Sequence, residues 1–307
     1  MIDSEKINET KNLKESCGTL SEEELKKISI LLSRVFEKNL KIQWKKEFSP
    51  SFLDWLYNKN PNGKAITYNV FDNENIIAHF SLVPITIVYN KKNFKSALSV
   101  LTAVDEKYRG LYLFHRVANK TFELAKSMGF KFIIGVANDI SAELFVKSFK
   151  FKSISSLEVK VGLNAFQKKN DFFHNFKVLW NNETLSWRLN NPRFKYQIYE
   201  SKNEFKIYNN NYKIFNIEMG SFSKEEYSFL IDHKNKTNFN FLPFSIWIGL
   251  DDYSSKKVFS FNLPNFLKPS ALNFKSSRSP KAKRFNSFFN SATFPRTSSD
   301  KLMPSRR

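Results

Sequence analysis

The sequence predicts an α/β protein with a mixed, mostly antiparallel central sheet flanked by helices. Three observations predict this class. Two helix-like segments open the chain, short strand-like runs separated by tight turns follow them, and residues 97–136 then read as strand, basic turn, helix and strand. Apolar residues make up 41% of the 307 residues, which is enough to form a substantial core.

The first two elements are predicted to be helices. Ser21 and Glu24 have the spacing of a capping box, so a helix should begin there. Ser49-Pro50 opens a second, short helix, and the Asn-Pro-Asn-Gly sequence at residues 60–63 marks a turn. The apolar residues of the first helix recur at helical intervals: Ile28, Leu31, Leu32 and Val35.

Strands are predicted next, because apolar and β-branched residues are bounded by turn residues. Residues 72–75, Asp-Asn-Glu-Asn, should form a hairpin turn between the first two of these strands. The predicted order is strand 66–71, strand 76–83 with a continuation to 88, strand 97–104, helix 113–128 and strand 130–136.

Charge and cysteine content limit the class of protein. The formal net charge is +20, and residues 268–307 hold ten basic residues and one acidic residue. A basic surface attracts phosphates, but biased composition explains the charge as well, and we find no nucleic-acid-binding motif. Cys17 is the single cysteine, so no internal disulfide can form, and no apolar run is long enough to span a bilayer. We therefore expect a cytoplasmic protein.

Four regions are expected along the chain. Residues 1–18 read as a flexible leader, and residues 276–307 as a disordered basic tail. Residues 19–160 contain the ordered pattern described above. Residues 161–275 echo it, because Trp187 and an Asn-Pro turn precede a strand-like run there, as Trp55 and an Asn-Pro turn do in the first half. An alternative is that such helix–turn–strand units are simply common.

Residues 104–114 join the strand to the helix, and they read Val-Asp-Glu-Lys-Tyr-Arg-Gly-Leu-Tyr-Leu-Phe, with Asn138 following the next strand. This arrangement resembles the core of the Gcn5-related N-acetyltransferase (GNAT) superfamily. The resemblance implies a GNAT-like sheet and the binding of acetyl-CoA or another acyl-CoA. The implied cofactor-binding residues are Ala103, Val104, Arg109, Gly110, Leu111, Tyr112, Leu113, Phe114, Asn138 and Ser141.

The turn explains why such a junction suits the cofactor. A turn that runs into a helix N-terminus offers backbone N–H groups and the positive end of the helix dipole to a pyrophosphate. Arg109 matches the family turn, whereas Tyr112 and Phe114 stand where the family has small residues. Their bulk is expected to hinder the approach of the phosphates, although the backbone donors survive any side chain. An alternative is that residues 109–114 are an ordinary basic helix start with Leu113 and Phe114 in the core. The strands carrying Val104 and residues 135–137 are expected to splay apart, leaving room for the pantetheine arm.

Catalytic groups are sparse in this pattern. Asn138, Asp105 and Glu106 are the nearest catalytic candidates, although a structural role explains each of them as well. Phe145 occupies the position where many family members carry a proton-donating Tyr. The candidate acceptor-binding residues are Tyr57, His79 and Trp187, although a structural role explains Tyr57 and His79 as well, and Trp187 could equally pack between the two halves. Four His and one Cys form no metal-ligand pattern, so no metal is expected.

The resemblance implies transfer of an acetyl or other acyl group to an amine of a small molecule, such as an amino sugar. The second half is then expected to be a degenerate GNAT-like copy, giving two tandem halves. Two alternatives remain open. One is a Fem-like transferase that uses charged tRNA, for which alone nucleic-acid binding is expected. The other is a non-catalytic binding protein with the same fold. The sequence indicates no oligomeric state.

Overall fold

The computed structural model describes eight stretches of the chain, and the predicted basic tail lies outside them. Among the helices within these stretches, none is both long and apolar enough to cross a membrane. The described residues are 13–18, 20–37, 48–137, 139–163, 176–209, 216–231, 244–251 and 256–262.

The helices and strands of the first half agree with the predicted order. The helices are α2 (Glu22–Glu37), α3 (Pro50–Tyr57), α4 (Leu113–Ser127), α5 (Asp139–Phe149) and α6 (Asn182–Leu189), with the 3-10 helices η3 (Glu106–Tyr108) and η4 (Ser228–Leu230). The strands are β1 (Lys14–Cys17), β2 (Ile66–Asp72), β3 (Asn75–Tyr89), β4 (Lys92–Val104), β5 (Phe132–Ala137), β6 (Lys152–Leu163), β7 (Phe176–Val178), β8 (Tyr196–Glu200), β9 (Glu204–Asn209), β10 (Asn216–Ser223), β11 (Phe244–Asp251) and β12 (Lys256–Asn262).

Local sequence signals explain where the first elements begin. The Ser21 hydroxyl accepts a bond from the Glu24 N–H at 3.2 Å, and the Glu24 carboxylate accepts one from the Ser21 N–H at 3.2 Å. This reciprocal pair is the predicted capping box of α2. Ser49 caps α3, with Pro50 in the first turn. Both helices therefore begin where the sequence predicted.

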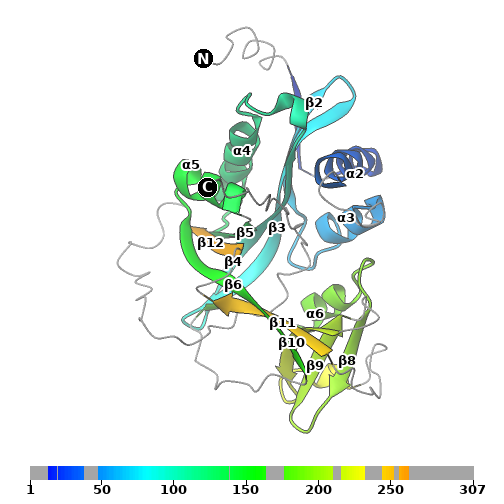
Figure 1. Ribbon diagram of the computed structural model, residues 1–307. Helices are drawn as coiled ribbons and strands as arrows, with labels where there is room; N and C mark the ends of the chain where they lie inside the picture. The colour runs from blue at the N-terminus through cyan, green and yellow to red at the C-terminus, as the bar shows by residue number, and fades with distance from the viewer. Residues whose placement is uncertain are drawn as a thin grey trace, which may run out of the picture.

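A single 12-stranded sheet runs through the described chain (Figure 1). Its strand order is β1-β2-β3-β4-β5-β12-β6-β11-β10-β9-β8, and β7 pairs with β3. The pairs β4–β5 and β10–β11 are parallel, and the other pairs are antiparallel. The predicted fold class, a mixed and mostly antiparallel sheet flanked by helices, is confirmed.

The first half of the sheet has a helical layer on each face (Figure 1). On one face α4 and α5 pack on strands β2–β5 around a core that includes Phe80, Val117 and Phe145. On the other face α2 and α3 pack around a core that includes Leu32 and Leu101. The functional question therefore concerns what lies between these two layers.

Residues 14–17 differ from the sequence prediction, which placed them in a flexible leader. They form β1 and pair antiparallel with β2. Side-chain contacts hold this edge strand. Arg116 forms an ion pair with Glu15 at 2.5 Å, and the Ser16 hydroxyl donates to Glu24 at 2.8 Å. Strand β1 was not predicted because these contacts come from distant elements.

The sheet continues across the boundary predicted at residue 160. Strand β6 runs through that boundary, and β12, from the predicted second half, lies between β5 and β6. Strand β6 in turn pairs with β11. Strands from the two predicted halves therefore pair with each other in one sheet.

Two stretches share one order of elements. A short helix, three antiparallel strands and a parallel fourth strand occur as α3–β2–β3–β4–β5 and again as α6–β8–β9–β10–β11. The two stretches differ before the fourth strand, where η3 and α4 follow β4, whereas the described residues after β10 form η4. The turn after the helix also repeats. Asn60 Oδ1 accepts from the Asn62 N–H at 2.9 Å, and Asn191 Oδ1 accepts from the Arg193 N–H at 2.9 Å. The duplication stays a prediction, and this shared order agrees with it.

Candidate functional site

The parallel pair β4–β5 opens partway along its length. Its ladder joins residues 96–99 of β4 to residues 132–135 of β5 and then ends, as the predicted splay requires. The register of β4 against β3 shifts just beyond this point, and Leu101 there has a φ of 50°. A bulge of this kind redirects a strand and frees part of its edge. Beyond Ser99, the edge of β4 that faces β5 is thus no longer paired with it, and we call this unpaired edge the gap.

The turn predicted to bind phosphate lies at the end of β4. The 3-10 helix η3 leads to Arg109, then to Gly110 with a φ of 85°, and then to Tyr112, which begins α4 with a φ of 57°. The side chain of Tyr112 makes no capping hydrogen bond. Arg109, Gly110 and Tyr112 are exposed, and Leu111 is half-buried. The turn therefore presents the positive end of a 15-residue helix to solvent.

Phe114 does not obstruct this turn but packs against the core, as the alternative interpretation of the helix start expects. Its ring packs inward against the rings of Phe145 (5.9 Å between centroids) and Phe149 (5.6 Å). Leu113 is buried in the same core. Only Tyr112, 58% exposed, remains as an added bulk near the turn. Phe145 lies on α5 at the expected place and is buried, so that position supplies no proton donor.

The predicted catalytic acids do not gather at one point. Asp105 is buried, and its carboxylate accepts from the Arg34 guanidinium at 2.5 Å and from the Lys107 N–H at 3.1 Å. Burial raises the pKa of Asp105, but the Lys107 N–H and the Arg34 guanidinium outweigh it and lower the pKa overall. Glu106 is exposed on η3. This geometry gives Asp105 a capping and ion-pairing role. Among the described contacts, none turns the carboxylate of Asp105 or Glu106 toward the gap.

The other predicted residues have different places. Ala103 is buried on the α2–α3 side, and Val104 is half-buried against the α4 core. Ser141 lies half-buried on α5. Asn138 lies outside the described residues, so its predicted roles in catalysis and cofactor binding stay predictions.

Tyr57 and His79 lie together, but inside the protein. The Tyr57 hydroxyl contacts His79 Nε2 at 3.0 Å and Ser81 Oγ at 3.1 Å. Ser81 donates to the Val100 carbonyl at 2.6 Å, and His79 Nδ1 contacts Asn69 Oδ1 at 2.6 Å. The side chains are fully or almost fully buried. They therefore cannot touch an acceptor directly, which agrees with the structural alternative, and they hold the backbone just before the Leu101 bulge.

Counting the available hydrogen atoms gives the protonation state of His79 and the orientation of the Asn69 amide in this buried hydrogen-bond network. Each of the four contacts needs one hydrogen, whereas Tyr57, Ser81 and a neutral His79 supply three. Turning over the Asn69 amide places its N–H group on His79 Nδ1 and supplies the fourth, at the expense of a 3.3 Å contact to Ser16. Burial lowers the pKa of His79 to about 3. We therefore assign the neutral ring and the turned amide.

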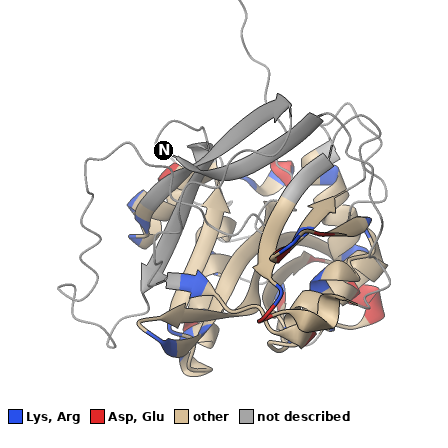
Figure 2. Cartoon of the chain, turned by 90° about the horizontal axis from the view of Figure 1, so that it is seen from below, with Lys and Arg blue, Asp and Glu red and all other residues tan. Residues whose placement is uncertain are grey.

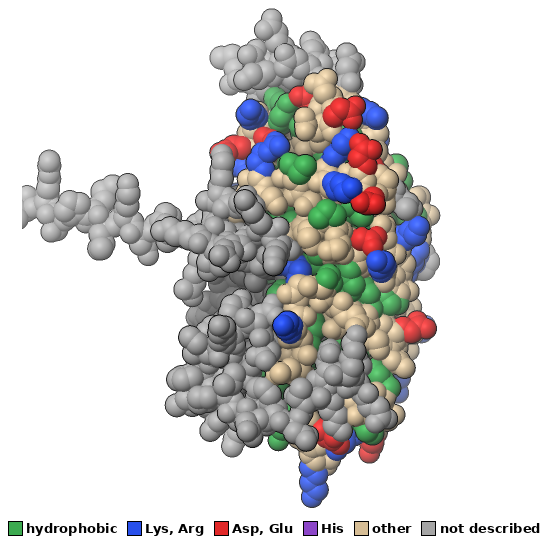
Figure 3. All heavy atoms as spheres, turned by 90° about the vertical axis from the view of Figure 1, so that its right-hand side faces the viewer, with side chains coloured by type: hydrophobic (Ala, Val, Ile, Leu, Met, Phe, Trp, Pro, Cys, Tyr) green, Lys and Arg blue, Asp and Glu red, His purple; other side chains and the backbone are tan. Residues whose placement is uncertain are grey.

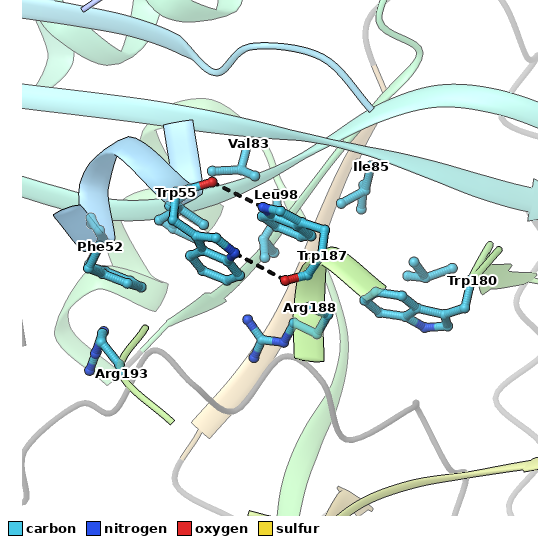
Figure 4. A pocket seen from close by; sticks show the side chains of 13 residues that line it. Phe52, Trp55, Val83, Ile85, Leu98, Trp180, Trp187, Arg188 and Arg193 are labelled. Atoms are coloured by element: carbon cyan, nitrogen blue, oxygen red, sulfur yellow. Dashed lines mark hydrogen bonds between the residues drawn. The ribbon is translucent and has the colours of Figure 1, made fainter. Parts of the chain in front are cut away.

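An aromatic pocket lies on the α3 face of the sheet, against the same bulge (Figure 4). It encloses about 710 Å³, including its part open to solvent. Its walls come from α3, β3, β4 and the segment that includes β7 and α6. The lining residues are Phe52, Trp55, Leu56, Val83, Ile85, Leu98, Val100, Leu101, Val178, Trp180, Trp187, Arg188 and Arg193.

Trp187, a predicted acceptor-binding residue, joins the two halves at this pocket. Its ring stacks on Trp55 at 4.4 Å between centroids. Each indole N–H donates to the backbone carbonyl of the other residue, at 3.1 Å and 3.0 Å (Figure 4). The guanidinium of Arg193 lies 4.4 Å from the ring centre of Phe52. The repeat of Trp55 was the sequence signal, and the contact agrees with the alternative that Trp187 packs between the two halves.

Described charges do not concentrate on one surface. Lys and Arg residues occur on several elements on different sides of the chain (Figure 2). On the α2 face acidic and basic side chains alternate (Figure 3), and ion pairs such as Lys26–Glu22 at 2.8 Å connect them. Among the described residues, no group of His, Cys, Asp and Glu could hold a metal.

Three crystal structures of other proteins share this fold. A probable N-acyltransferase from Enterococcus faecalis V583 aligns with a TM-score of 0.53 and 11% identity, covering 81% of this chain and 71% of its own. GCN5-related N-acetyltransferases from Kribbella flavida and Anabaena variabilis each align at 0.52 and 9% identity. They cover 82% and 80% of this chain, and 71% and 72% of their own chains.

These likenesses establish a GNAT-like fold. No protein-family model matches the sequence, and no curated protein matches it either.

Proposed function

We propose that this protein is an N-acyltransferase that moves an acetyl or other acyl group from acyl-CoA to an amine of a small molecule. One observation carries the proposal: the β4–β5 ladder ends at Ser99, and the exposed N-terminus of α4 follows directly after β4. The freed strand edge offers backbone groups to the amides of the pantetheine arm. The helix N-terminus suits the pyrophosphate. The GNAT-like fold supports the same interpretation.

The reaction balances without a metal or a covalent enzyme intermediate. The neutral amine attacks the thioester carbonyl, the new C–N bond forms, and the C–S bond breaks. The amine proton leaves through solvent, and the thiolate takes up a proton there, because Phe145 cannot donate one. The protein contributes orientation of the two reactants, and an N–H group near the Leu101 bulge is suited to polarise the carbonyl.

The finer parts of the proposal concern substrate and organisation. An amino sugar is one amine of the required type. We infer that residues 161–275 are a degenerate GNAT-like copy, supported by the repeated order of elements and the repeated Asn-Pro turn. A cytoplasmic location is part of the same proposal.

Titration of acetyl-CoA into the full-length protein by calorimetry tests the proposal. Gly110 and Gly129 form a matched pair, because both have positive φ values (85° and 79°) and open space where a Cβ atom would lie. A Trp at either position therefore has a similar backbone cost, about 1–2 kcal/mol. Gly110 lies in the turn before α4, whereas Gly129 lies after the other end of α4. Gly110→Trp should weaken binding at least tenfold, and Gly129→Trp less than twofold.

Charge provides a second comparison. Arg109→Gln should weaken acetyl-CoA binding several-fold, whereas Lys126→Gln, in the last turn of α4, should not. Absence of binding by the unmodified protein at millimolar acetyl-CoA would contradict the proposal. Salt-sensitive binding of charged tRNA would then support the Fem-like alternative. Binding of neither ligand would support a non-catalytic protein.

A further inference from the structure

We propose that the aromatic pocket binds the acyl chain of the donor, so that the donor is an acyl-CoA whose linear chain is longer than acetyl. This inference rests on the proposed function, because the chain is the group to be transferred. Transfer to the amine forms the C–N bond, breaks the C–S bond and releases coenzyme A, as for an acetyl group. The proposal specifies the donor and leaves the amine acceptor open.

The gap leads from the turn before α4 to a closed end. It comprises residues 100–104 of β4, because Ser99 and Gly135 form the last pair of β4 with β5. At about 3.3 Å per residue these positions extend over about 13 Å, which is of the same order as an extended pantetheine arm. A Cβ atom added to Gly135 would lie 3.9 Å from the Cβ of Ser99, so the strands are in contact there. A chain attached to the thioester therefore has to leave the plane of the sheet at this end.

One backbone N–H group indicates where the thioester lies. The Val100 carbonyl accepts a 2.6 Å hydrogen bond from Ser81 and thus points toward β3, the neighbour of β4 on the side away from β5. None of the described peptide bonds is cis, and in a trans peptide the N–H points opposite to the carbonyl. The Leu101 N–H is therefore directed at the gap, where it can polarise the thioester carbonyl. The first carbons of the acyl chain then lie beside Val100 and Leu101.

The two faces of the sheet offer the chain unequal space at this point. On the α4 face, Phe80 and Ala97 are fully buried in the core. On the α3 face, Ile85, Leu98 and Val100 are only half-buried, although β3 and β4 are inner strands of the sheet. These three side chains line the pocket. The pocket is therefore the side on which an acyl chain can cover apolar surface that the protein itself leaves open.

The bulge gives the pocket a wall that starts at the thioester. Successive residues of a regular strand face opposite sides of the sheet, but Val100 and Leu101 both line the pocket. The register shift between β3 and β4 explains this arrangement, because a bulge places an extra residue on one strand. The apolar wall thus begins at the residue whose N–H is directed at the thioester.

The chemistry of the lining favours a hydrocarbon chain. All lining residues except Arg188 and Arg193 are aliphatic or aromatic. Both guanidinium groups lie near aromatic rings, Arg193 at 4.4 Å from the ring centre of Phe52 and Arg188 at 5.9 Å from that of Trp55. In Figure 4 both Arg side chains lie on the side of the stacked Trp pair that is away from the labelled strand residues. A polar occupant beside those strand residues would lose hydrogen bonds to water, whereas a hydrocarbon chain has none to lose.

Calorimetric titration of the full-length protein with CoA esters of increasing chain length tests the inference. Each buried methylene group should tighten binding about threefold, so octanoyl-CoA, kept below its micelle concentration, should bind at least tenfold more tightly than acetyl-CoA. Leu98→Phe fills the pocket and should remove most of this gain, whereas coenzyme A itself, which has no acyl chain, should bind equally well. Leu144→Phe, the same change at an exposed position of α5, should retain the whole gain.

A second variant and a second measurement keep the inference testable if Leu98→Phe folds poorly. Ile85→Phe narrows the pocket from β3 and should reduce the gain in the same way. Three Trp residues line the pocket, so octanoyl-CoA should change the Trp fluorescence of the unmodified protein more than acetyl-CoA does.

Equal affinities for acetyl-CoA and octanoyl-CoA would overturn the inference. A gain that both pocket variants retain would overturn it as well, because the chain would then bind elsewhere. Equal affinities together with octylamine binding that Leu98→Phe abolishes would instead assign the pocket to an apolar acceptor. In each of these cases the proposed function stands if acetyl-CoA binds and Gly110→Trp weakens its binding, whereas absence of any CoA binding contradicts the proposed function itself.

Discussion

Removal of the Tyr57 hydroxyl should destabilise the protein although no ligand touches it. Tyr57→Phe deletes one oxygen that bridges His79 at 3.0 Å and Ser81 at 3.1 Å. Tyr57 is 1% exposed, and His79 and Ser81 are fully buried, so water cannot easily replace the lost bonds. With a net contribution of about 0.5–1.5 kcal/mol for each hydrogen bond, we expect a loss of about 2 kcal/mol.

Urea unfolding followed by circular dichroism measures this loss from the shift in midpoint. Tyr112→Phe is the matched control, because it removes the same atom from a side chain that is 58% exposed. That control should stay within about 0.5 kcal/mol of the unmodified protein. Equal midpoints for the two variants would refute the reasoning, since the buried chain would then contribute nothing to stability.

Three further predictions follow from individual side chains. Burial lowers the pKa of His79 to about 3, so between about pH 6.5 and 3 the unfolded chain binds a proton at His79 that the folded protein does not bind. The free energy of unfolding should therefore fall as the pH drops from about 6.5 toward 3. In urea titrations, the free energy of unfolding should change by up to about 1.4 kcal/mol per pH unit because of this group. His79→Gln should remove that slope, and an unchanged slope in the variant would exclude His79 as its source. Asp105→Asn weakens the ion pair with Arg34 and should lower the free energy of unfolding by about 1–2 kcal/mol. Turnover should change less than tenfold. A far larger loss of turnover would support Asp105 as a catalytic base. Phe114→Ala should cost about 2 kcal/mol without tightening acetyl-CoA binding in calorimetry, because its half-buried ring packs against the core. Tighter binding would show that Phe114 does obstruct the turn.

The order of elements in the first half could be predicted because its signals are local. The capping box at Ser21, the Asp-Asn-Glu-Asn turn and the apolar periodicity of α4 each depend on neighbouring residues. The strand–turn–helix unit likewise lies within residues 97–136. These signals were sufficient for the fold class and for the position of the turn before α4.

Side-chain direction at the turn was left open between two interpretations, because local signals do not decide it. Tyr112 and Phe114 are two residues apart and both aromatic, yet one is exposed and the other packs on Phe145. The helix start sends Phe114 toward the sheet and leaves Tyr112 outside. The direction depends on α4 docking against β2 and β3, which no pattern within the turn contains.

The sequence by itself determined a GNAT-like α/β fold, the basic turn before α4 and the repeat of Trp55 at Trp187. Only the tertiary structure decided that the repeated Trp residues stack on each other, that Tyr57 and His79 are buried, and that Arg188 and Arg193 share an apolar pocket. The physical reason is sequence separation. Helix, turn and strand signals act over a few residues, whereas the pocket forms only when α6 docks against α3, 132 positions away along the chain.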